Sequence, residues 1–456
     1  MQSIFQLTQQ EFEALKSVYI HRSLSVPELE EILSYTPIKQ PSALRTAQDL
    51  LDGLEKKGLI KPVQSNDQQS FWSVTNSGVW QLREDAYFRG SCLERFEKSA
   101  KQINIHPSRI KHQRNLNSFV IPLLRELRNV PGVTYPDKMN NPNDSQFLQP
   151  DGIITIPKGA ITTGNWSNPK INIYLESDLN TENMEQIYRK MPSYDAYLNR
   201  TCMPGDWNIV AFFCYDSAIP FEKVLHTNLE RRTPVDKRKE SRHNKIKDTF
   251  RISLNSNMRE NRGDVEFLIG TPVNVLAALL ELIFHKQTSH KLVLNALAEW
   301  NPLLQPVPLP VDGRQRMACD YSACVQSPML RARFLFHTYT PESLLDYVAV
   351  GMNLELPEQM DPSFNGKTWR VIVLPDIGML DNLIRSCYFP SYQKDPFLVT
   401  TLSSLATKRE WHKLFFMITE NGFAQCDPTF TVWTPVEKKD LIAAHQFPGA
   451  SPSSKH

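Results

Sequence analysis

Acidic side chains stand at the ends of two apolar segments in the middle of the chain. Asp151 comes directly before Gly152 and Ile153, and Glu176 follows the segment that ends at Leu175. Short β-branched segments bounded by Gly and Pro are typical of buried strands, and two adjacent strands would bring these carboxylates to one edge of a sheet. Carboxylate oxygens are the ligands that Mg²⁺ prefers, usually together with substrate phosphate. The pattern therefore predicts a metal site suited to phosphodiester cleavage.

The positive charge that such a site needs must come from another element. The position two residues after Glu176, the usual place for a lysine in a nuclease of this kind, holds Asp178. A third carboxylate extends the predicted metal ligands to Asp151, Glu176 and Asp178, but it cannot offset negative charge that develops on phosphorus. Lys190, on a helix predicted after the second strand, is the candidate for that role, so the predicted catalytic residues are Asp151, Glu176 and Lys190. The alternatives for the lysine are Lys158 and Lys170.

Three interpretations of the acidic residues remain open on the sequence alone. The first is metal-dependent chemistry, with Mg²⁺ or Mn²⁺ as the cofactor. The second is a degenerate nuclease fold that binds DNA without cutting it. The third is a structural role, because acids at strand ends often serve as caps or salt-bridge partners.

Length and composition set the general class of the protein. The chain has 456 residues, which predicts two to four domains. Its hydrophobic content of 41% is typical of a globular protein, and no apolar segment approaches the ~20 residues that span a bilayer. Residues 1–6 have neither a basic nor an apolar leader pattern, so a cytoplasmic location without a membrane partner is expected. The seven cysteines are scattered without a Cys-x-x-Cys pair, so reduced thiols are expected.

Residues 1–83 are predicted to form a winged helix that binds double-stranded DNA. Thr8 and Ser25 can each cap a helix, and apolar residues at helical spacing predict a third helix over 42–57. Two short strands on either side of a polar tip would then form the wing. Four side chains of the third helix are predicted to reach a DNA groove, namely Ser42, Arg45, Gln48 and Lys56. The alternative is that this unit docks onto another protein.

The rest of the chain divides into five predicted segments. These are a connecting helix over 84–111, a restriction-endonuclease-like domain over 112–225, a basic segment over 226–264, a C-terminal α/β region over 265–436 and a disordered tail over 437–456. Within the C-terminal region, the Pro-rich stretch 302–310 is predicted to be a linker. The predicted fold class is therefore multidomain α/β, with a winged helix, a restriction-endonuclease-like PD-(D/E)XK-type domain and a C-terminal α/β region.

The basic segment has two possible roles. Between Arg231 and Arg262 there are eleven Lys and Arg residues against four acids. Such a segment is either a solvated linker or a loop that contacts DNA phosphates, because neutralising phosphates releases condensed counterions. In the second case, the predicted DNA-binding residues include Lys237, Arg238, Lys239 and Arg242.

Several of these motifs together resemble a known family. They are the N-terminal winged-helix pattern, His112 with Asn117, Pro150-Asp151-Gly152, Glu176-Ser177-Asp178, Thr181, Lys190 and Tyr194. In this combination, over about residues 5–215, the chain resembles the replication-relaxation family of plasmid and conjugative-element proteins. The resemblance implies a cytoplasmic DNA-binding protein with a restriction-endonuclease-like core, in which His112 and Tyr194 support the site. Asn180 stands where the family usually carries a glycine.

The sequence lacks the motifs of other DNA-processing chemistries. None of its eleven histidines lies two residues from another, so the histidine-hydrophobe-histidine relaxase motif is missing. A phosphate-binding GxxxxGK[ST] loop is missing as well, which argues against ATP-driven remodelling. The leading expectation is a mobile-element protein that nicks or cleaves DNA with Mg²⁺. The alternatives are a non-catalytic replication or transcription regulator, and an adaptor that assembles other replication or conjugation proteins.

Overall fold

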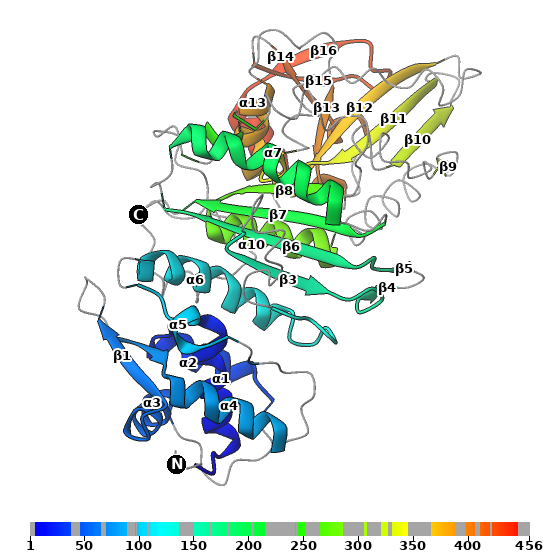
Figure 1. Ribbon diagram of the computed structural model, residues 1–456. Coiled ribbons are helices and arrows are strands. Elements are labelled where there is room, and N and C mark those ends of the chain that lie inside the picture. The colour runs from blue at the N-terminus through cyan, green and yellow to red at the C-terminus, as the bar shows by residue number, and fades with distance from the viewer. Residues whose placement is uncertain are drawn as a thin grey trace.

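The computed structural model describes a mixed α/β protein (Figure 1). The described residues are 5–37, 46–64, 70–88, 96, 98–106, 109–135, 150–163, 166–179, 183–201, 205–214, 242, 245–247, 249–250, 265–285, 305–307, 321–326, 331–344, 366–387, 397–405, 411–419 and 422–445. Within these ranges the strands form an eight-stranded sheet, a four-stranded sheet and two small two-stranded sheets. None of the helices in these ranges is long and apolar enough to cross a membrane.

The N-terminal unit consists of helices around a two-stranded ribbon. Its elements are α1 (Gln9–His21), α2 (Val26–Tyr35), α3 (Ala47–Lys56), β1 (Ile60–Gln64), β2 (Ser70–Val74) and α4 (Asn76–Phe88). The predicted caps are confirmed, because Thr8 and Ser25 each form a capping box with the glutamate three residues later. Leu15, Leu50 and Leu82 lie fully buried in its core. The predicted start of the third helix at Ser42 is wrong, because Thr46 has extended backbone angles and caps a helix that begins at Ala47; Ser42 itself lies outside the described residues.

The prediction of a connecting helix over 84–111 is wrong. Helix α4 already begins at Asn76, and the four-residue helix α5 (Ala100–Ile103) starts anew after Ser99. Ser99 has extended backbone angles and caps α5 with Gln102, and Asn104 is extended again, so the chain leaves the helical path twice. The long helix α6 (Ile110–Glu126) follows and leads to the central sheet.

Strands β3 (Gly152–Ile156), β6 (Ile171–Asp178), β7 (Trp207–Cys214) and β8 (Val265–Gly270) form the central four-stranded sheet. Strand β3 is antiparallel to β6, whereas β6, β7 and β8 are parallel. The small sheet of β4 (Thr162–Thr163) and β5 (Trp166–Ser167) lies between β3 and β6 in the chain. Parallel strands need helical crossovers and are covered on both faces, which explains the buried, apolar character of β6 and β7.

Helices cover both faces of this sheet (Figure 1). Helix α6 packs on one face together with α10 (Pro272–Leu280), which continues into the π-helical turn η2 (Glu281–His285). On that side the rings of Phe119 and Phe213 stack with centroids 4.4 Å apart. Helix α7 (Met184–Thr201) packs on the other face, where Tyr174 and Phe212 belong to its core.

The predicted domain boundaries at residues 225 and 265 are wrong. Strand β8 pairs with β7 from Asn208 opposite Val265 onward, and Leu279 of α10 is buried in the same core as Phe119 of α6. Residues 265–285 therefore complete the central domain. The sequence did not indicate this because a parallel partner strand can come from any distance along the chain.

The C-terminal part is an eight-stranded mixed sheet. Its strands are β9 (Gln305–Val307), β10 (Tyr321–Gln326), β11 (Arg331–Thr338), β12 (Lys367–Leu374), β13 (Leu398–Thr401), β14 (Phe416–Thr419), β15 (Gly422–Cys426) and β16 (Trp433–Val436). Its helices are η5 (Ile377–Met379), α13 (Leu380–Cys387), α14 (Leu402–Leu405), η6 (Trp411–Leu414) and α15 (Lys438–His445).

Two predictions for this region are wrong. The stretch 302–310 is not simply a linker, because β9 pairs with β10 at the sheet edge, a position where a strand tolerates Pro306. The predicted disordered tail 437–456 is helical over α15, whose Leu441 is buried against the C-terminal core. Residues 446–456 lie outside the described residues.

Candidate active site at the edge of the central sheet

Asp151 lies at the edge of the central sheet, between the layers of helices. Its backbone N–H donates to Leu175 O (2.9 Å), and its Oδ2 accepts a hydrogen bond from the backbone N–H of Ser177 (2.9 Å). The Nε2 of His112, on α6, lies 3.2 Å from the same oxygen. Because Ser177 directly follows Glu176, the carboxylate of Asp151 contacts the β6 backbone one residue beyond Glu176. His112 therefore lies beside Asp151.

Glu176 points to the opposite helical layer and is held by two donors from α7. Lys190 Nζ lies 2.8 Å from Glu176 Oε2, and Tyr194 Oη donates to Oε1 (2.7 Å). Lys190 and Tyr194 are four residues apart, so they lie on the same face of the helix. The Lys190 ammonium also lies 5.4 Å from the centre of the Phe212 ring, a cation–π distance. The structure therefore brings the predicted Glu176, Lys190 and Tyr194 together.

Different neighbouring groups give the two buried carboxyl groups different proton affinities. Burial and the negative charge of Asp151 raise the pKa of Glu176 to about 7, against the lowering effect of Lys190. Burial acts in the same direction on Asp151, but the hydrogen bond and charge of His112 and the Ser177 N–H hold its pKa below the usual range. Burial and the neighbouring Glu176 raise the pKa of Tyr194 well above its ordinary value. Two adjacent carboxyl groups with separated pKa values are typical of sites that handle protons.

Asp178, the third predicted metal ligand, is engaged by a different cation. It shares the α7 side of β6 with Glu176, but its Oδ2 accepts a hydrogen bond from Arg242 Nε (2.7 Å). The Asp178 side chain is fully buried, and 19% of the Arg242 side chain is exposed. In the described ranges, no group of three or more His, Cys, Asp or Glu side chains is arranged to hold a metal ion. Among the described residues, Asp178 thus forms no metal-binding cluster with Asp151 and Glu176.

Asp151 and Glu176 nevertheless have the donor chemistry of a magnesium site. Both offer hard carboxylate oxygens, and Mg²⁺ is commonly bound by one or two carboxylates with water and substrate phosphate completing its shell. The side chains of Lys190 and His112 are 23% and 36% exposed, so the site is open to solvent beside them. Two carboxylates are too few to hold a cation by protein ligands alone. They suit a divalent cation whose remaining ligands are water and a substrate phosphate.

Helix α6 supports the site and joins it to the N-terminal unit. Asn115 Nδ2 donates to Ser177 Oγ (2.7 Å), next to the backbone N–H that binds Asp151. Asn117, two residues further, donates to Ser23 O (2.9 Å) in the turn between α1 and α2. Arg125 extends the same interface with an ion pair to Glu31 at 2.6 Å. Sequence reasoning missed Asn115 and assigned Arg242 to DNA phosphates rather than to Asp178, because nothing in the local pattern shows which distant strand these residues contact.

The predicted DNA-binding residues fall into three groups. Ser42, Arg45, Lys237, Arg238 and Lys239 lie outside the described residues. On α3, Gln48 and Lys56 are exposed, and the Gln48 amide donates to Asp52 Oδ1 (2.7 Å). Arg242 is described and contacts Asp178 as stated above. Of the four α3 side chains predicted to reach a DNA groove, Gln48 and Lys56 are therefore described and exposed.

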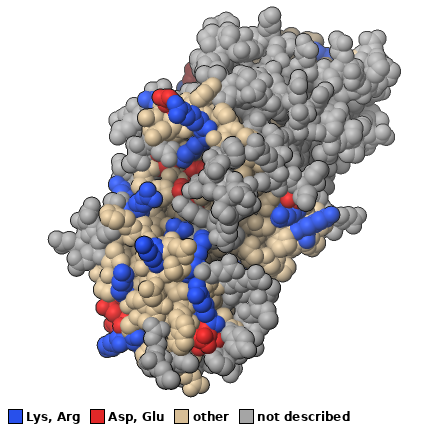
Figure 2. Space-filling view, viewed as in Figure 1, with Lys and Arg blue, Asp and Glu red and all other residues tan. Residues whose placement is uncertain are grey.

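Basic side chains are prominent on the described surface of the N-terminal half. Figure 2 shows Lys and Arg gathered over this part of the molecule, with fewer Asp and Glu between them. A surface of this kind favours contact with polyanions.

A comparison with protein families supports the resemblance seen in the motifs. The family model described as Replication-relaxation matches residues 15–207, a segment that begins within α1 and ends at the start of β7. The match includes the acidic pair and the α7 residues that bind Glu176. No curated protein and no solved structure matches the chain. Residues 15–207 are thus identified as a Replication-relaxation segment, as the motifs predicted.

Proposed function

We propose that this chain is a DNA-binding protein of plasmid or conjugative-element replication, and that the edge of its central sheet cleaves phosphodiester bonds. One observation carries the catalytic part. Asp151 accepts a hydrogen bond from the backbone N–H of Ser177, the residue after Glu176, and a lysine and a tyrosine from α7 converge on Glu176. The family match supplies the connection to plasmid replication.

In this proposal the N-terminal unit is a winged helix and the central domain is restriction-endonuclease-like. Three helices followed by a two-stranded ribbon support the first assignment, with α3 as the helix that enters the DNA groove. A mixed sheet covered by helices on both faces, with acids at one strand end, supports the second. The partner is double-stranded DNA.

The side chains at the sheet edge have separate roles. Asp151 and Glu176 would hold Mg²⁺ or Mn²⁺, which when bound would supply Lewis-acid stabilisation of the phosphate and a more acidic water. Lys190 brings positive charge to the place where negative charge develops in the transition state. Tyr194 fixes the carboxylate of Glu176 from the buried side, while His112 and the Ser177 N–H keep Asp151 ionised.

Lys190 thereby takes the place of the lysine that is missing two residues after Glu176. A side chain at position 178 would leave the same face of the sheet, on the side covered by α7. Lys190 reaches that side from the helix, with its ammonium 2.8 Å from Glu176. The positive charge is thus supplied on the α7 side of the sheet by a helix residue, whereas in the usual arrangement a residue of the strand supplies it.

A non-catalytic DNA-binding regulator is the second candidate function. It is favoured by the saturation of Glu176, since each of its carboxylate oxygens accepts a hydrogen bond from α7. In this case the buried pair serves to dock α7 on the sheet and binds no metal. An adaptor for replication or conjugation proteins is a third candidate, in which the N-terminal unit binds protein.

The decisive experiment is a nicking assay on supercoiled plasmid with Mg²⁺ or Mn²⁺, comparing the wild type with Asp151→Ala. Asp206→Ala is the matched control, because Asp206 precedes β7 at the opposite end of the sheet and its side chain is 15% exposed against 18% for Asp151. We expect the wild type and Asp206→Ala to nick DNA and Asp151→Ala to be inactive.

The remaining outcomes separate the three candidates. Tight DNA binding without divalent-dependent cleavage of supercoiled, linear or single-stranded DNA would support the regulator and overturn the enzyme. Absence of DNA binding would favour the adaptor. Equal loss of activity in both variants would show that the acidic pair has no special role.

A further inference from the structure

A cavity with a basic lining lies between the N-terminal unit and α6, outside every residue considered above for DNA binding. It has a volume of about 690 Å³. The residues that line it are Arg22, Lys98, Gln102, Asn104, Ile105, His106 and Arg109. They include three permanent cations and a histidine, with no carboxylate. A cavity with this lining attracts an anion, and its volume is in the range of about 300–1,000 Å³ found for pockets that bind organic ligands.

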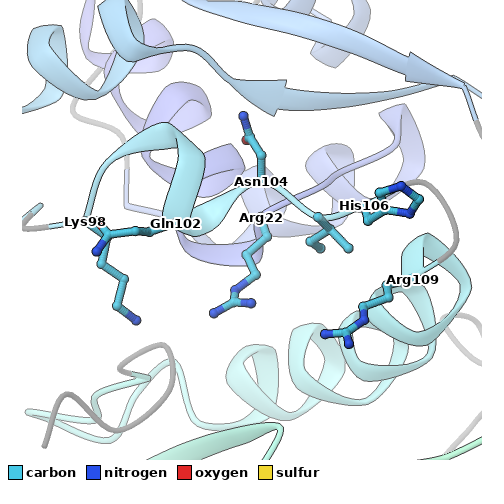
Figure 3. Close-up of a pocket in the computed structure, with 7 residues that line it drawn as sticks. Arg22, Lys98, Gln102, Asn104, His106 and Arg109 are labelled. Carbon is cyan, nitrogen blue, oxygen red and sulfur yellow. The ribbon is translucent and has the colours of Figure 1, made fainter. Parts of the chain in front are cut away.

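Three segments far apart in the chain bring the cationic groups together. Arg22 terminates α1, Lys98 comes just before α5, and Arg109 is the residue before α6. Figure 3 shows the charged ends of these three side chains reaching the space between the α5 segment and α6. Asn104 points the other way, and its Nδ2 donates to Val74 O (3.0 Å).

The backbone holds this arrangement in place. Arg22 has a φ of 63°, in the left-handed region that a residue other than glycine seldom adopts. Its carbonyl accepts a hydrogen bond from Ser73 of β2 (3.3 Å), and the Ser23 carbonyl next to it binds Asn117 of α6. Strained backbone of this kind persists only where surrounding contacts define it, and it is frequent at ligand sites.

The position of the cavity relates it to the acidic pair. Arg109 and His112 are three residues apart at the start of α6, a rise of about 4.5 Å along a helix. His112 in turn contacts Asp151. An extended polyanion bound beside Arg22, Lys98 and Arg109 would therefore continue toward the carboxylates at the sheet edge.

We propose that the cavity binds the backbone of a single DNA strand on the side of α6 that leads to His112 and Asp151. Arg22, Lys98 and Arg109 would neutralise successive phosphates, and the ring of His106 and the side chain of Ile105 would contact the exposed base or sugar. Cationic grooves with rings for base stacking are the general means of binding a single strand without sequence preference. A free phosphate ion uses only a small part of such a volume. The proposal rests on the DNA-binding part of the proposed function, and it does not require cleavage.

The test is the binding of a fluorescent single-stranded oligonucleotide to the full chain, measured by anisotropy in EDTA at several salt concentrations. The variant is Lys98→Ala with Arg109→Ala. The matched control is Lys101→Ala with Lys111→Ala, which removes the same charge from exposed neighbours on α5 and α6 that do not line the cavity. Thermal denaturation establishes that both variants fold.

We expect the cavity variant to bind at least tenfold more weakly than the control. The slope of log affinity against log salt should fall by about 1.4, since each phosphate contact on a single strand contributes about 0.7. An oligonucleotide with uncharged methylphosphonate linkages should bind both variants equally.

Three results would overturn the assignment. The first is equal affinity of the cavity variant and the control. The second is competition by pyrophosphate as effective, per phosphate, as the oligonucleotide, which would make the cavity a small-anion site. The third is a larger effect on duplex than on single-stranded DNA. Failure of the wild type to bind any DNA would instead refute the proposed function itself.

Discussion

Lys190 Nζ lies 2.8 Å from Glu176 Oε2, although the two residues are on different elements and fourteen positions apart in the chain. Glu176 is on a buried strand and only 3% of its side chain is exposed, whereas 23% of the Lys190 side chain is exposed. The ammonium group therefore stands between the buried carboxylate and the solvent. A phosphate that approaches Asp151 and Glu176 from solvent would meet this charge first.

Replacing Lys190 by alanine should separate catalysis from binding. We expect cleavage by Lys190→Ala to fall by ~10² or more while DNA affinity stays nearly unchanged, because an electrostatic stabiliser of the transition state is lost. Arg189→Ala is the control, since Arg189 is the adjacent residue on α7 and 75% of its side chain is exposed. Single-turnover nicking and anisotropy titration measure the two quantities. Parallel loss of affinity and rate would assign Lys190 to DNA binding.

Tyr194 should contribute to stability through its hydroxyl group. Its ring is buried in the core under α7 and its hydroxyl donates to Glu176 (2.7 Å). Tyr194→Phe keeps the ring, and the lost hydrogen bond to a buried carboxyl group should lower the free energy of unfolding by about 1–3 kcal/mol. Urea denaturation without divalent ions measures this. Tyr188→Phe, at a position that is 43% exposed, should be within about 0.5 kcal/mol of the wild type. Equal stability of the two variants would contradict the assigned contact.

The pair of Asp178 and Arg242 should behave as a structural ion pair. Both carboxylate oxygens of Asp178 accept hydrogen bonds from the guanidinium, at 2.7 and 3.4 Å. Asp178→Asn and Arg242→Gln should each destabilise the fold, and the double variant should be less destabilised than the sum, with a coupling of about 0.5–3 kcal/mol. A metal-ligand role for Asp178 predicts a different outcome, in which Asp178→Asn weakens Mn²⁺ binding and Arg242→Gln does not. A double-mutant cycle and a metal titration distinguish the two.

Local sequence patterns predicted most of the elements that position the site. Strands β3 and β6 were expected from their β-branched segments, and the capping boxes of α1 and α2 from Thr8 and Ser25. The site residues Asp151, Glu176, Lys190 and Tyr194 come together because only the small β4–β5 hairpin separates β3 from β6, and α7 follows β6 directly. Pro192 does not end α7, which continues to Thr201, so Lys190 and Tyr194 keep a common face.

Long-range pairing is what the sequence could not reveal. Arg242 reaches Asp178 from 64 residues further along the chain, and β8 joins β7 after a connection of similar scale. The basic cavity likewise combines Arg22, Lys98 and Arg109, each of which reads locally as an ordinary charged residue at a helix end. Such contacts are set by tertiary packing. The periodicity of a sequence reports only local helix or strand structure, so it cannot predict them.

Glu28 should make the stability of the N-terminal unit depend on pH. Its side chain is buried and its Oε2 accepts hydrogen bonds from the Ser25 N–H (2.6 Å) and hydroxyl (2.8 Å) at the start of α2. Burial raises the pKa of Glu28 above its ordinary 4.5, against the lowering effect of these hydrogen bonds. Above pH 4.5 the unfolded chain therefore ionises before the folded one, and stability is lost as pH rises through the folded pKa. Glu28→Gln keeps the size of the side chain and removes this titration.

The stability of Glu28→Gln relative to the wild type should consequently increase as the pH rises above 4.5, because the wild type loses the contribution of the neutral acid. Urea denaturation at a series of pH values measures the difference. Glu30→Gln removes the same charge from the exposed side of α2 and should follow the wild-type pH dependence. A difference between Glu28→Gln and the wild type that stays constant over this range would show that the carboxyl of Glu28 has the same pKa in the folded and unfolded chain. The capping box would then hold an ionised carboxylate in spite of its burial.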